Sequence, residues 1–141
     1  VLGDGRLMLE REPDQGFDLL AMDAFSGDSI PAHLLTLEAM QDYLRHLKPD
    51  GILAVHITNR YLDLQPVMAA AAQHFGKTAL LYELERDDDN DFCFTSDWVL
   101  IMSPERAAAL PPIMNDGVAL KPKPGFRPWT DAFSNLFSVL K

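Results

Sequence analysis

Three aspartates lie next to a glycine or after an apolar run of the chain, at positions where a ligand-binding turn or strand end is expected. Asp4 precedes Gly5 near the start of the sequence, Asp23 closes the apolar run 17–23, and Asp28 follows a few residues later. A carboxylate in such a position can hold a cationic group or accept a proton from it. The alternative for each is structural, because aspartate also caps loops, forms plain turns with glycine and occupies solvated turns.

Polar side chains also follow a second apolar run, 52–57. His56 lies within its end, and Asn59 and Tyr61 come shortly after it, so these three could line the same site as the aspartates. A histidine at the end of a strand is also a common structural residue whose ring nitrogens are both hydrogen-bonded. The other three histidines show no spacing typical of metal ligands, and the single cysteine excludes a cysteine-rich zinc site, so we predict no metal centre.

The apolar pattern alternates between short continuous runs, typical of buried strands, and runs with three- and four-residue steps, typical of amphipathic helices. An Ala-rich segment ends before Gly76, and glycine commonly terminates helices. The pattern predicts strands at 17–23, 52–57, 78–84 and 98–102, and helices at 34–47, 64–75, 104–110 and 133–140.

The order of these elements predicts an α/β fold. Strands separated by helices form a parallel sheet with right-handed crossovers. The acidic stretch 83–91 joins the last two strands and leaves no room for a crossover helix, so these strands should form an antiparallel pair. A parallel sheet that ends in an antiparallel pair is the back half of a Rossmann-like sheet of the AdoMet-methyltransferase type. Such sheets bind ligands at the carboxyl ends of their strands.

Four segments resemble the spermidine synthase family, the polyamine aminopropyltransferases. In that family the Gly-Asp-Gly turn contacts the adenine of decarboxylated AdoMet or of its thioether product. The resemblance implies cosubstrate-binding roles for Asp4 and Gly5 and, in the catalytic loop, for Pro31 and Ala32. The similar segments are residues 2–6 for the turn, 17–23 with 30–36 for the catalytic strand and loop, 47–53 for the next helix end and strand, and 129–134 near the end of the chain.

This sequence departs from the family in two ways. The family's glycine-rich nucleotide loop and its ribose-binding acid would lie upstream, so we expect residues 1–141 to form a single, N-terminally incomplete domain with a proline-rich tail, 111–141, packed on it. The family's catalytic loop reads Asp-x-x-Asp-Pro, with the second aspartate as the base. Counting from Asp23, that position is Ser26, and Asp28 comes two residues later. We assign substrate orientation to Asp23, proton acceptance by a rearranged loop to Asp28, and site lining to Ser26.

The resemblance implies a transferase that passes an aminopropyl group from decarboxylated AdoMet, its cosubstrate, to a polyamine such as putrescine, with no tightly bound cofactor. We expect this activity in a longer parent protein and an inactive isolated chain. Two alternatives stay open: an AdoMet-dependent methyltransferase of the same fold, and a degenerate, non-catalytic association domain. The loop 23–31 favours the aminopropyltransferase over the methyltransferase.

The formal net charge of −9 argues against a nucleic-acid partner, which needs a basic face. More than half of this charge lies in the stretch 83–91, with six acids and one base, which we expect to be a solvated hairpin loop. No apolar run reaches the ~18 residues of a membrane span. We expect a cytoplasmic protein, or one at the cytoplasmic face of the membrane if the parent is fused to membrane segments. The first inner strand would lack a neighbour, so we also expect homo-oligomers.

Overall fold

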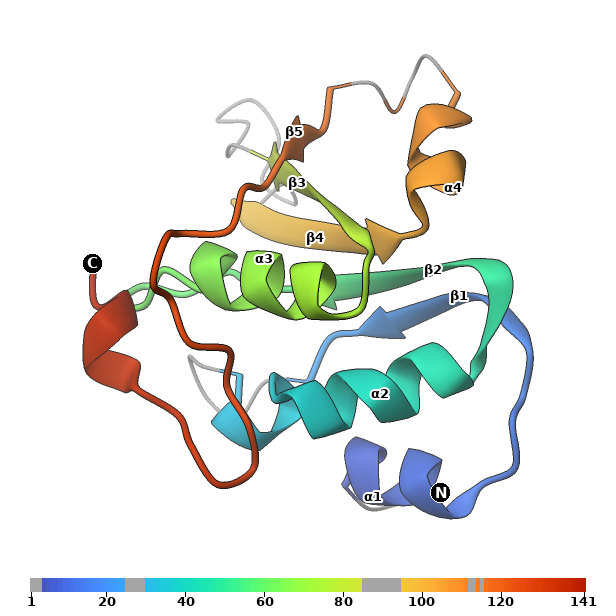
Figure 1. Ribbon diagram of the computed structural model, residues 1–141, viewed down its shortest axis with the longest axis horizontal. Coiled ribbons are helices and arrows are strands. Elements are labelled where there is room, and N and C mark those ends of the chain that lie inside the picture. The colour runs from blue at the N-terminus through green and yellow to red at the C-terminus, as the bar shows by residue number, and fades with distance from the viewer. Residues whose placement is uncertain (1–3, 25–29, 85–94, 112–113, 115) are drawn as a thin grey trace.

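A computed structural model describes residues 4–24, 30–84, 95–111, 114 and 116–141. Its centre is a five-stranded sheet with the strand order β1-β2-β4-β3-β5 (Figure 1). The strands are β1 (Phe17–Met22), β2 (Leu47–His56), β3 (Thr78–Leu84), β4 (Ser96–Met102) and β5 (Val118–Ala119).

The sheet mixes parallel and antiparallel pairs. β1 and β2 are parallel, whereas β4 runs antiparallel to both of its neighbours, β2 and β3. Because β2 and β3 are each antiparallel to β4, the strands β1, β2 and β3 all point the same way. The predicted α/β sheet with an antiparallel pair is confirmed, and the structure adds that β4 is inserted between β2 and β3.

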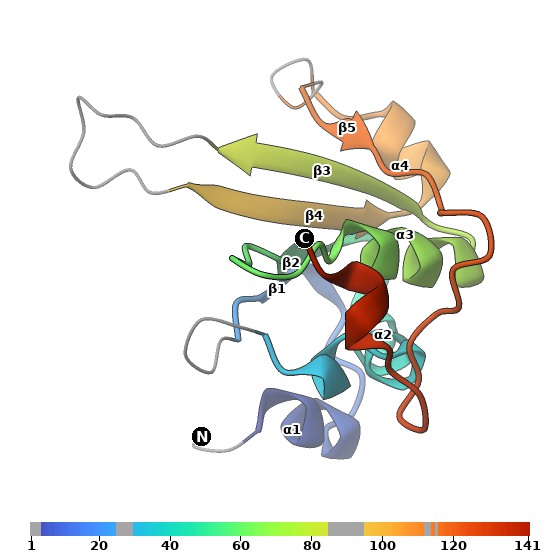
Figure 2. The ribbon, with the colours of Figure 1, turned by 90° about the vertical axis from the view of Figure 1, so that its left-hand side faces the viewer.

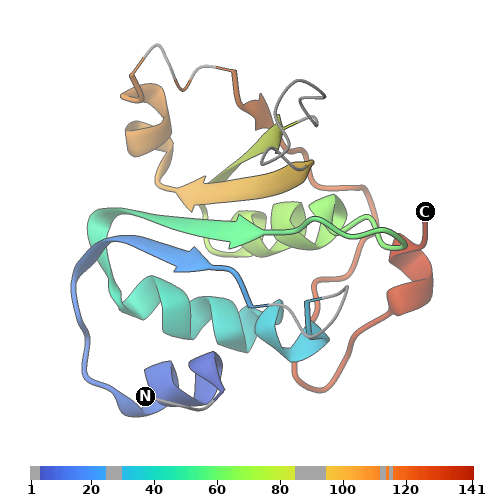
Figure 3. The same cartoon turned by 180° about the vertical axis from the view of Figure 1, so that it is seen from behind.

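Helices cover one face of this sheet. Figures 1 and 3 show α2 (Leu37–Arg45) and α3 (Gln65–His74) on the same side of the strands. Side chains of α2 and α3 form the core with alternate residues of the strands, so that Leu53, Val55 and Ile57 are buried together on one face. None of the described helices is long and apolar enough to cross a membrane. The other helices are α1 (Gly5–Arg11), α4 (Pro104–Ala108) and two short 3-10 helices, η1 (Ala32–Leu34) and η3 (Leu136–Val139).

Several predicted boundaries move for local reasons. The helix predicted from residue 34 begins at Leu37, because the Thr36 side chain caps it by accepting from the Ala39 N–H at 3.3 Å. The strand predicted at 52–57 begins earlier than expected, because β2 starts at Leu47, the last residue of the predicted helix. A Cβ on Gly51 would lie 2.9 Å from the Phe17 carbonyl oxygen, so glycine allows β2 to approach β1 here.

The segment expected to be a turn after Asp4 is a helix instead. Asp4 adopts an extended conformation and caps α1, with its side chain accepting from the Leu7 N–H at 3.1 Å. An Asp-Gly pair signals a turn as well as a helix cap, so the sequence alone does not predict this helix. Residues 2 and 3, which begin the segment similar to the family's Gly-Asp-Gly turn, lie outside the described part of the chain.

β1 is less buried than its apolar sequence predicts. Leu19 is 57% exposed and Phe17 is 37% exposed, while only Met22 of this strand is buried. The reason is its place in the sheet, because β1 is the edge strand beside β2. An exposed strand edge can pair with another chain, which agrees with the expected homo-oligomer. The oligomer itself stays a prediction.

The C-terminal segment, residues 120–141, connects β5 at one edge of the sheet with the carboxyl ends of β1 and β2 (Figure 1). It runs from β5 across the helical side of the molecule to η3, which lies near the carboxyl ends of β1 and β2 (Figures 1 and 2). Trp129 anchors this segment in the core with 2% exposure, and its carbonyl oxygen accepts from the Leu37 N–H at 2.9 Å. The end of the chain is tied to the loop after β2, where Asp63 N–H donates to the Val139 carbonyl oxygen at 2.7 Å.

Truncating the Trp129 side chain tests whether this segment is part of the cooperative fold. We expect Trp129→Ala to lower the free energy of unfolding by about 3–5 kcal/mol, because a large buried side chain is lost and a cavity remains. Phe137→Ala is the matched control, since Phe137 lies in the same segment and is 87% exposed. Urea unfolding followed by circular dichroism measures both. An equal effect of the two substitutions would contradict a structural role for Trp129.

Candidate functional site

The first polar pair of the site is formed by Asp23 and His56 at the carboxyl ends of β1 and β2. The register of the two strands sets Met22 opposite Val55, so the next residue of each strand lies at the same edge of the sheet. His56 Nδ1 lies 2.7 Å from Asp23 Oδ1, and the Asp23 side chain is 60% exposed. The structure thus presents a carboxylate to solvent at the edge where the fold class predicts a ligand.

β4 fixes the position of the His56 ring. Trp98, the cross-strand partner of His56, stacks on the imidazole with ring centroids 4.7 Å apart and an interplanar angle of 7°. His56 Nε2 lies 2.7 Å from Thr58 Oγ1, and that oxygen accepts from the Asp97 N–H at 2.7 Å. A chain of hydrogen bonds therefore runs from the backbone of β4 through Thr58 and His56 to Asp23.

The partners of His56 determine which nitrogen carries the proton in the neutral ring. An ionised carboxylate only accepts hydrogen bonds, so Nδ1–H must donate to Asp23. The Thr58 hydroxyl then donates its proton to Nε2 while its oxygen accepts from Asp97. Both ring nitrogens of His56 are therefore hydrogen-bonded, as expected for a structural histidine at the end of a strand. The same arrangement holds one oxygen of Asp23 in place.

The second polar pair joins α1 to η1. Asp4 Oδ2 lies 2.9 Å from His33 Nε2, while Asp4 Oδ1 accepts from the Leu7 N–H. The Leu7 N–H and, to a lesser degree, the hydrogen bond with His33 lower the pKa of Asp4 below its ordinary value. Pro31 precedes η1 as its N-cap residue, and Ala32 is its first residue. Asp4, Pro31 and Ala32 are therefore held in neighbouring segments.

A cavity of about 240 Å³ lies next to this pair, between α1, η1 and the C-terminal segment. Arg6 reaches it from α1 and is 8% exposed. Its guanidinium pairs with Asp131 through Nη1–Oδ1 at 2.7 Å and Nη2–Oδ2 at 2.6 Å. This pairing raises the pKa of Arg6 and lowers the pKa of Asp131, in each case chiefly through the hydrogen bonds between the two side chains. The residues that line the cavity include Arg6, Ala32, His33, Thr130 and Asp131.

The other predicted site residues have different positions. Asn59 is buried, and its Oδ1 accepts from the Tyr61 and Leu62 N–H groups at 2.9 and 2.8 Å, so it shapes the loop after β2. The Tyr61 side chain is exposed, with the Arg60 guanidinium 5.7 Å from its ring centroid. Gly5 is the first residue of α1, with open space where a Cβ would lie.

Two predicted residues, Ser26 and Asp28, lie outside the described residues. In the ranges that the structure describes, no group of three or more histidine, cysteine, aspartate or glutamate side chains is placed to hold a metal ion.

Sequence reasoning missed the residues that support these pairs. Trp98 stacks on His56 from β4, a strand that the sequence did not place beside β2. Thr58, in the loop after β2, accepts a hydrogen bond from the same strand. His33 and Arg6 meet partners far away in the sequence, 29 residues for His33–Asp4 and 125 residues for Arg6–Asp131. Local periodicity carries no signal for such contacts.

Comparison with known proteins identifies the fold. Neither family models nor curated proteins give a match to this sequence. Among solved structures, the chain is similar to the crystal structure of a probable spermidine synthase from Corynebacterium glutamicum ATCC 13032, with a TM-score of 0.61 and 18% identity. The alignment covers 96% of this chain and 55% of that chain, so the present chain spans about half the length of the similar protein.

This similarity shows a spermidine-synthase-like fold, which is of the methyltransferase type. The fold predicted from the sequence is therefore confirmed. At 18% identity this likeness shows the fold alone, and the roles of Asp4 and Asp23 stay predictions.

The proton position on His56 can be measured directly. We expect neutral His56 to carry its proton on Nδ1, and the nitrogen chemical shifts of the two ring atoms report this in a long-range ¹H–¹⁵N correlation spectrum. In Asp23→Asn the preference should weaken, because the neutral amide can also donate a hydrogen bond. The exposed His74 provides an internal reference. A wild-type His56 with its proton on Nε2 would contradict the assigned hydrogen-bond chain.

Proposed function

We propose that this chain belongs to a spermidine-synthase-like transferase, which passes an aminopropyl group from decarboxylated AdoMet to an amine such as putrescine. The observation that carries the proposal is the exposed Asp23 carboxylate at the carboxyl end of β1, held by His56, in a spermidine-synthase-like fold. The resemblance of the segments around Asp4, Asp23 and Ala32 to the family supports the same activity.

The proposed reaction is the attack of a neutral amine nitrogen on the carbon next to a sulfonium. A carbon–nitrogen bond forms, the carbon–sulfur bond breaks, and its electron pair converts the sulfonium into a neutral thioether. The attacking amine must lose a proton, because alkyl amines with a pKa near ~10 are mostly protonated at neutral pH. The sulfonium already makes a good leaving group, so positioning of the amine contributes much of the catalysis.

Asp23 suits the amine side of this reaction. Its Oδ1 is fixed by His56, which leaves Oδ2 to bind and orient a cationic amine at the exposed edge. We assign proton acceptance to Asp28, five residues further along the same loop. His56 supports Asp23 through the ring stacking and hydrogen bonds of β4, so we treat it as a positioning residue.

Asp4, Gly5, Pro31 and Ala32 suit the cosubstrate side. The two oxygens of Asp4 each accept one hydrogen bond, from Leu7 and His33. A carboxylate offers about four acceptor positions, so Asp4 can still accept from the amino group of an adenine. A carboxyl with an ordinary pKa is already ionised at neutral pH, and the lowered pKa of Asp4 extends the ionised form to more acidic conditions.

The test is Asp23→Asn in the whole natural protein that contains this chain. We expect the amine-dependent release of the thioether product from decarboxylated AdoMet to fall by about 10²-fold or more in kcat/KM, because the amine loses the carboxylate that orients it for attack. The loss should appear with putrescine as acceptor and be measured by chromatography of the thioether nucleoside.

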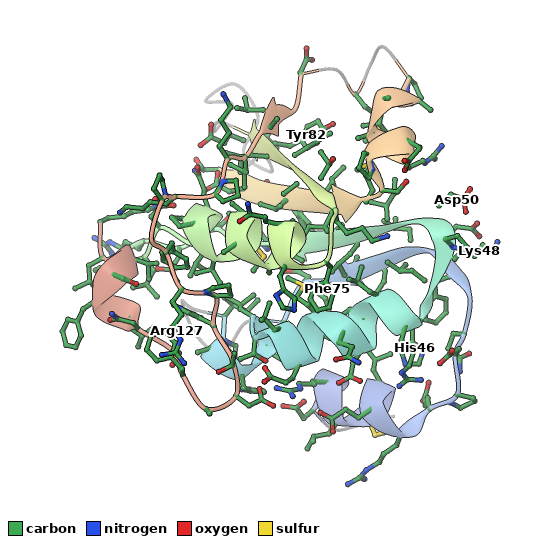
Figure 4. The ribbon with its side chains drawn as sticks, viewed as in Figure 1. His46, Lys48, Asp50, Phe75, Tyr82 and Arg127 are labelled. Atoms are coloured by element: carbon green, nitrogen blue, oxygen red, sulfur yellow. The ribbon has the colours of Figure 1, made fainter. Side chains whose placement is uncertain are left out.

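Asp50→Asn is the matched control, since Asp50 is exposed. Figure 4 shows Asp50 near the start of β2, away from the carboxyl ends of the strands. Thioether release at the wild-type rate in Asp23→Asn would remove Asp23 from the mechanism. Transfer of a methyl group from AdoMet, with no reaction of decarboxylated AdoMet, would instead identify a methyltransferase.

A further inference from the structure

Helix α1, which Asp4 caps, packs its partly buried Leu9 against the core, and Leu9 lies in the second half of the helix. Its one buried residue is Arg6, a cation. Burying a guanidinium is costly unless its charge and its N–H groups are paired. The position of the start of α1 therefore depends on what Arg6 contacts.

Arg6 connects α1 to two other segments. Besides the paired contact with Asp131, its Nη1 donates to the His33 carbonyl oxygen at 2.7 Å and lies 3.3 Å from Thr36 Oγ1. Its Nε donates to Glu10 at 3.0 Å, but Glu10 lies on the same helix and cannot tie α1 to anything else. Asp131 is thus the acidic partner of Arg6 that comes from outside α1 among the described residues.

Asp131 is itself held in place by α2. Thr36 Oγ1 donates to Asp131 Oδ1 at 2.8 Å, and the Asp131 N–H donates to Glu38 Oε2 at 3.0 Å. Two residues earlier, buried Trp129 fixes the same segment to the Leu37 N–H. The carboxylate is therefore held by Thr36 and Glu38 and by a segment that Trp129 anchors in the core.

The other end of α1 is held without the C-terminal segment. Arg45 Nη2 donates to the Leu9 carbonyl oxygen at 2.8 Å, and His46 Nε2 lies 2.8 Å from the same oxygen. Figure 4 shows His46 at the end of α2, pointing toward α1. Without the Arg6–Asp131 contact, the guanidinium would lose its charge partner from outside α1, and the start of the helix would be held less firmly than the other end.

We propose that Asp131 is a positioning residue for the cosubstrate edge of the site. By fixing Arg6, its carboxylate holds the start of α1 against η1 and so keeps Asp4 and His33 in contact, 29 residues apart in the sequence. The docking of the C-terminal segment and the binding of an adenine-containing thioether or sulfonium are then coupled, each favouring the other. The ligand class rests on the proposed function, whereas the placement of α1 by Asp131 does not.

The experiment compares Asp131→Asn with Asp116→Asn, the same change at an exposed position earlier in the C-terminal region. The first readout needs no ligand: amide hydrogen exchange of residues 7–10 by NMR should be about tenfold faster or more in Asp131→Asn, with the amides of β2 and β4 unchanged. Arg6→Lys, which keeps the charge but loses the paired geometry, should change exchange in the same direction.

The second readout uses methylthioadenosine, a thioether nucleoside, and the whole natural protein. We expect its dissociation constant to rise about fivefold or more in Asp131→Asn, the usual range of a coupling between two sites. The KM for decarboxylated AdoMet should rise while the KM for putrescine stays the same, a split that general loss of structure would not produce.

Unchanged exchange of residues 7–10 in both Asp131→Asn and Arg6→Lys would overturn the proposal. Faster exchange with an unchanged dissociation constant would overturn the coupling to the cosubstrate. If the wild-type protein neither binds methylthioadenosine nor releases thioether, the proposed function is overturned. Faster exchange of residues 7–10 in Asp131→Asn would still support the placement of α1 by Asp131.

Discussion

The parallel pairing of β1 with β2 is the constraint on which the candidate site depends. Its register sets Ala21 opposite Ala54 and Met22 opposite Val55, so Asp23 and His56 leave the sheet side by side. A shift by one residue would turn every side chain of β1 to the other face and separate this pair. Gly51 helps to maintain the pairing, because any larger residue there would collide with the Phe17 carbonyl.

Two elements from later in the sequence complete the site on either side of this strand pair. β4 supports His56 with a stacked tryptophan and a hydrogen bond through Thr58, while the C-terminal segment supports α1 through Asp131. β4 thus holds His56 beside Asp23 at the carboxyl ends of the strands, and Asp131 holds Arg6 of the helix that follows Asp4. Paired charges and saturated hydrogen bonds fix these side chains where apolar packing is sparse.

The sequence predicts the strands well because continuous apolar runs mark them, and the exit of β1 points to Asp23. It predicts the burial of β1 wrongly, because the apolar run is typical of a strand covered on both faces, whereas β1 has one neighbour and is largely exposed among the described strands. α1 was missed because an aspartate followed by glycine signals a turn as well as a helix cap. The contact of Arg6 with Asp131 depends on the path of a segment more than a hundred residues away, and no local pattern encodes that path.

The central claim is that a cationic amine binds at the Asp23–His56 edge, although the most acidic part of the chain is the stretch 83–91. Amide chemical-shift mapping of the chain during titration with putrescine decides between these two locations. We expect chemical-shift changes centred on Asp23, His56 and Thr58, and we expect Asp23→Asn to abolish them. Shifts confined to residues 83–91, unchanged by that substitution, would contradict the central claim.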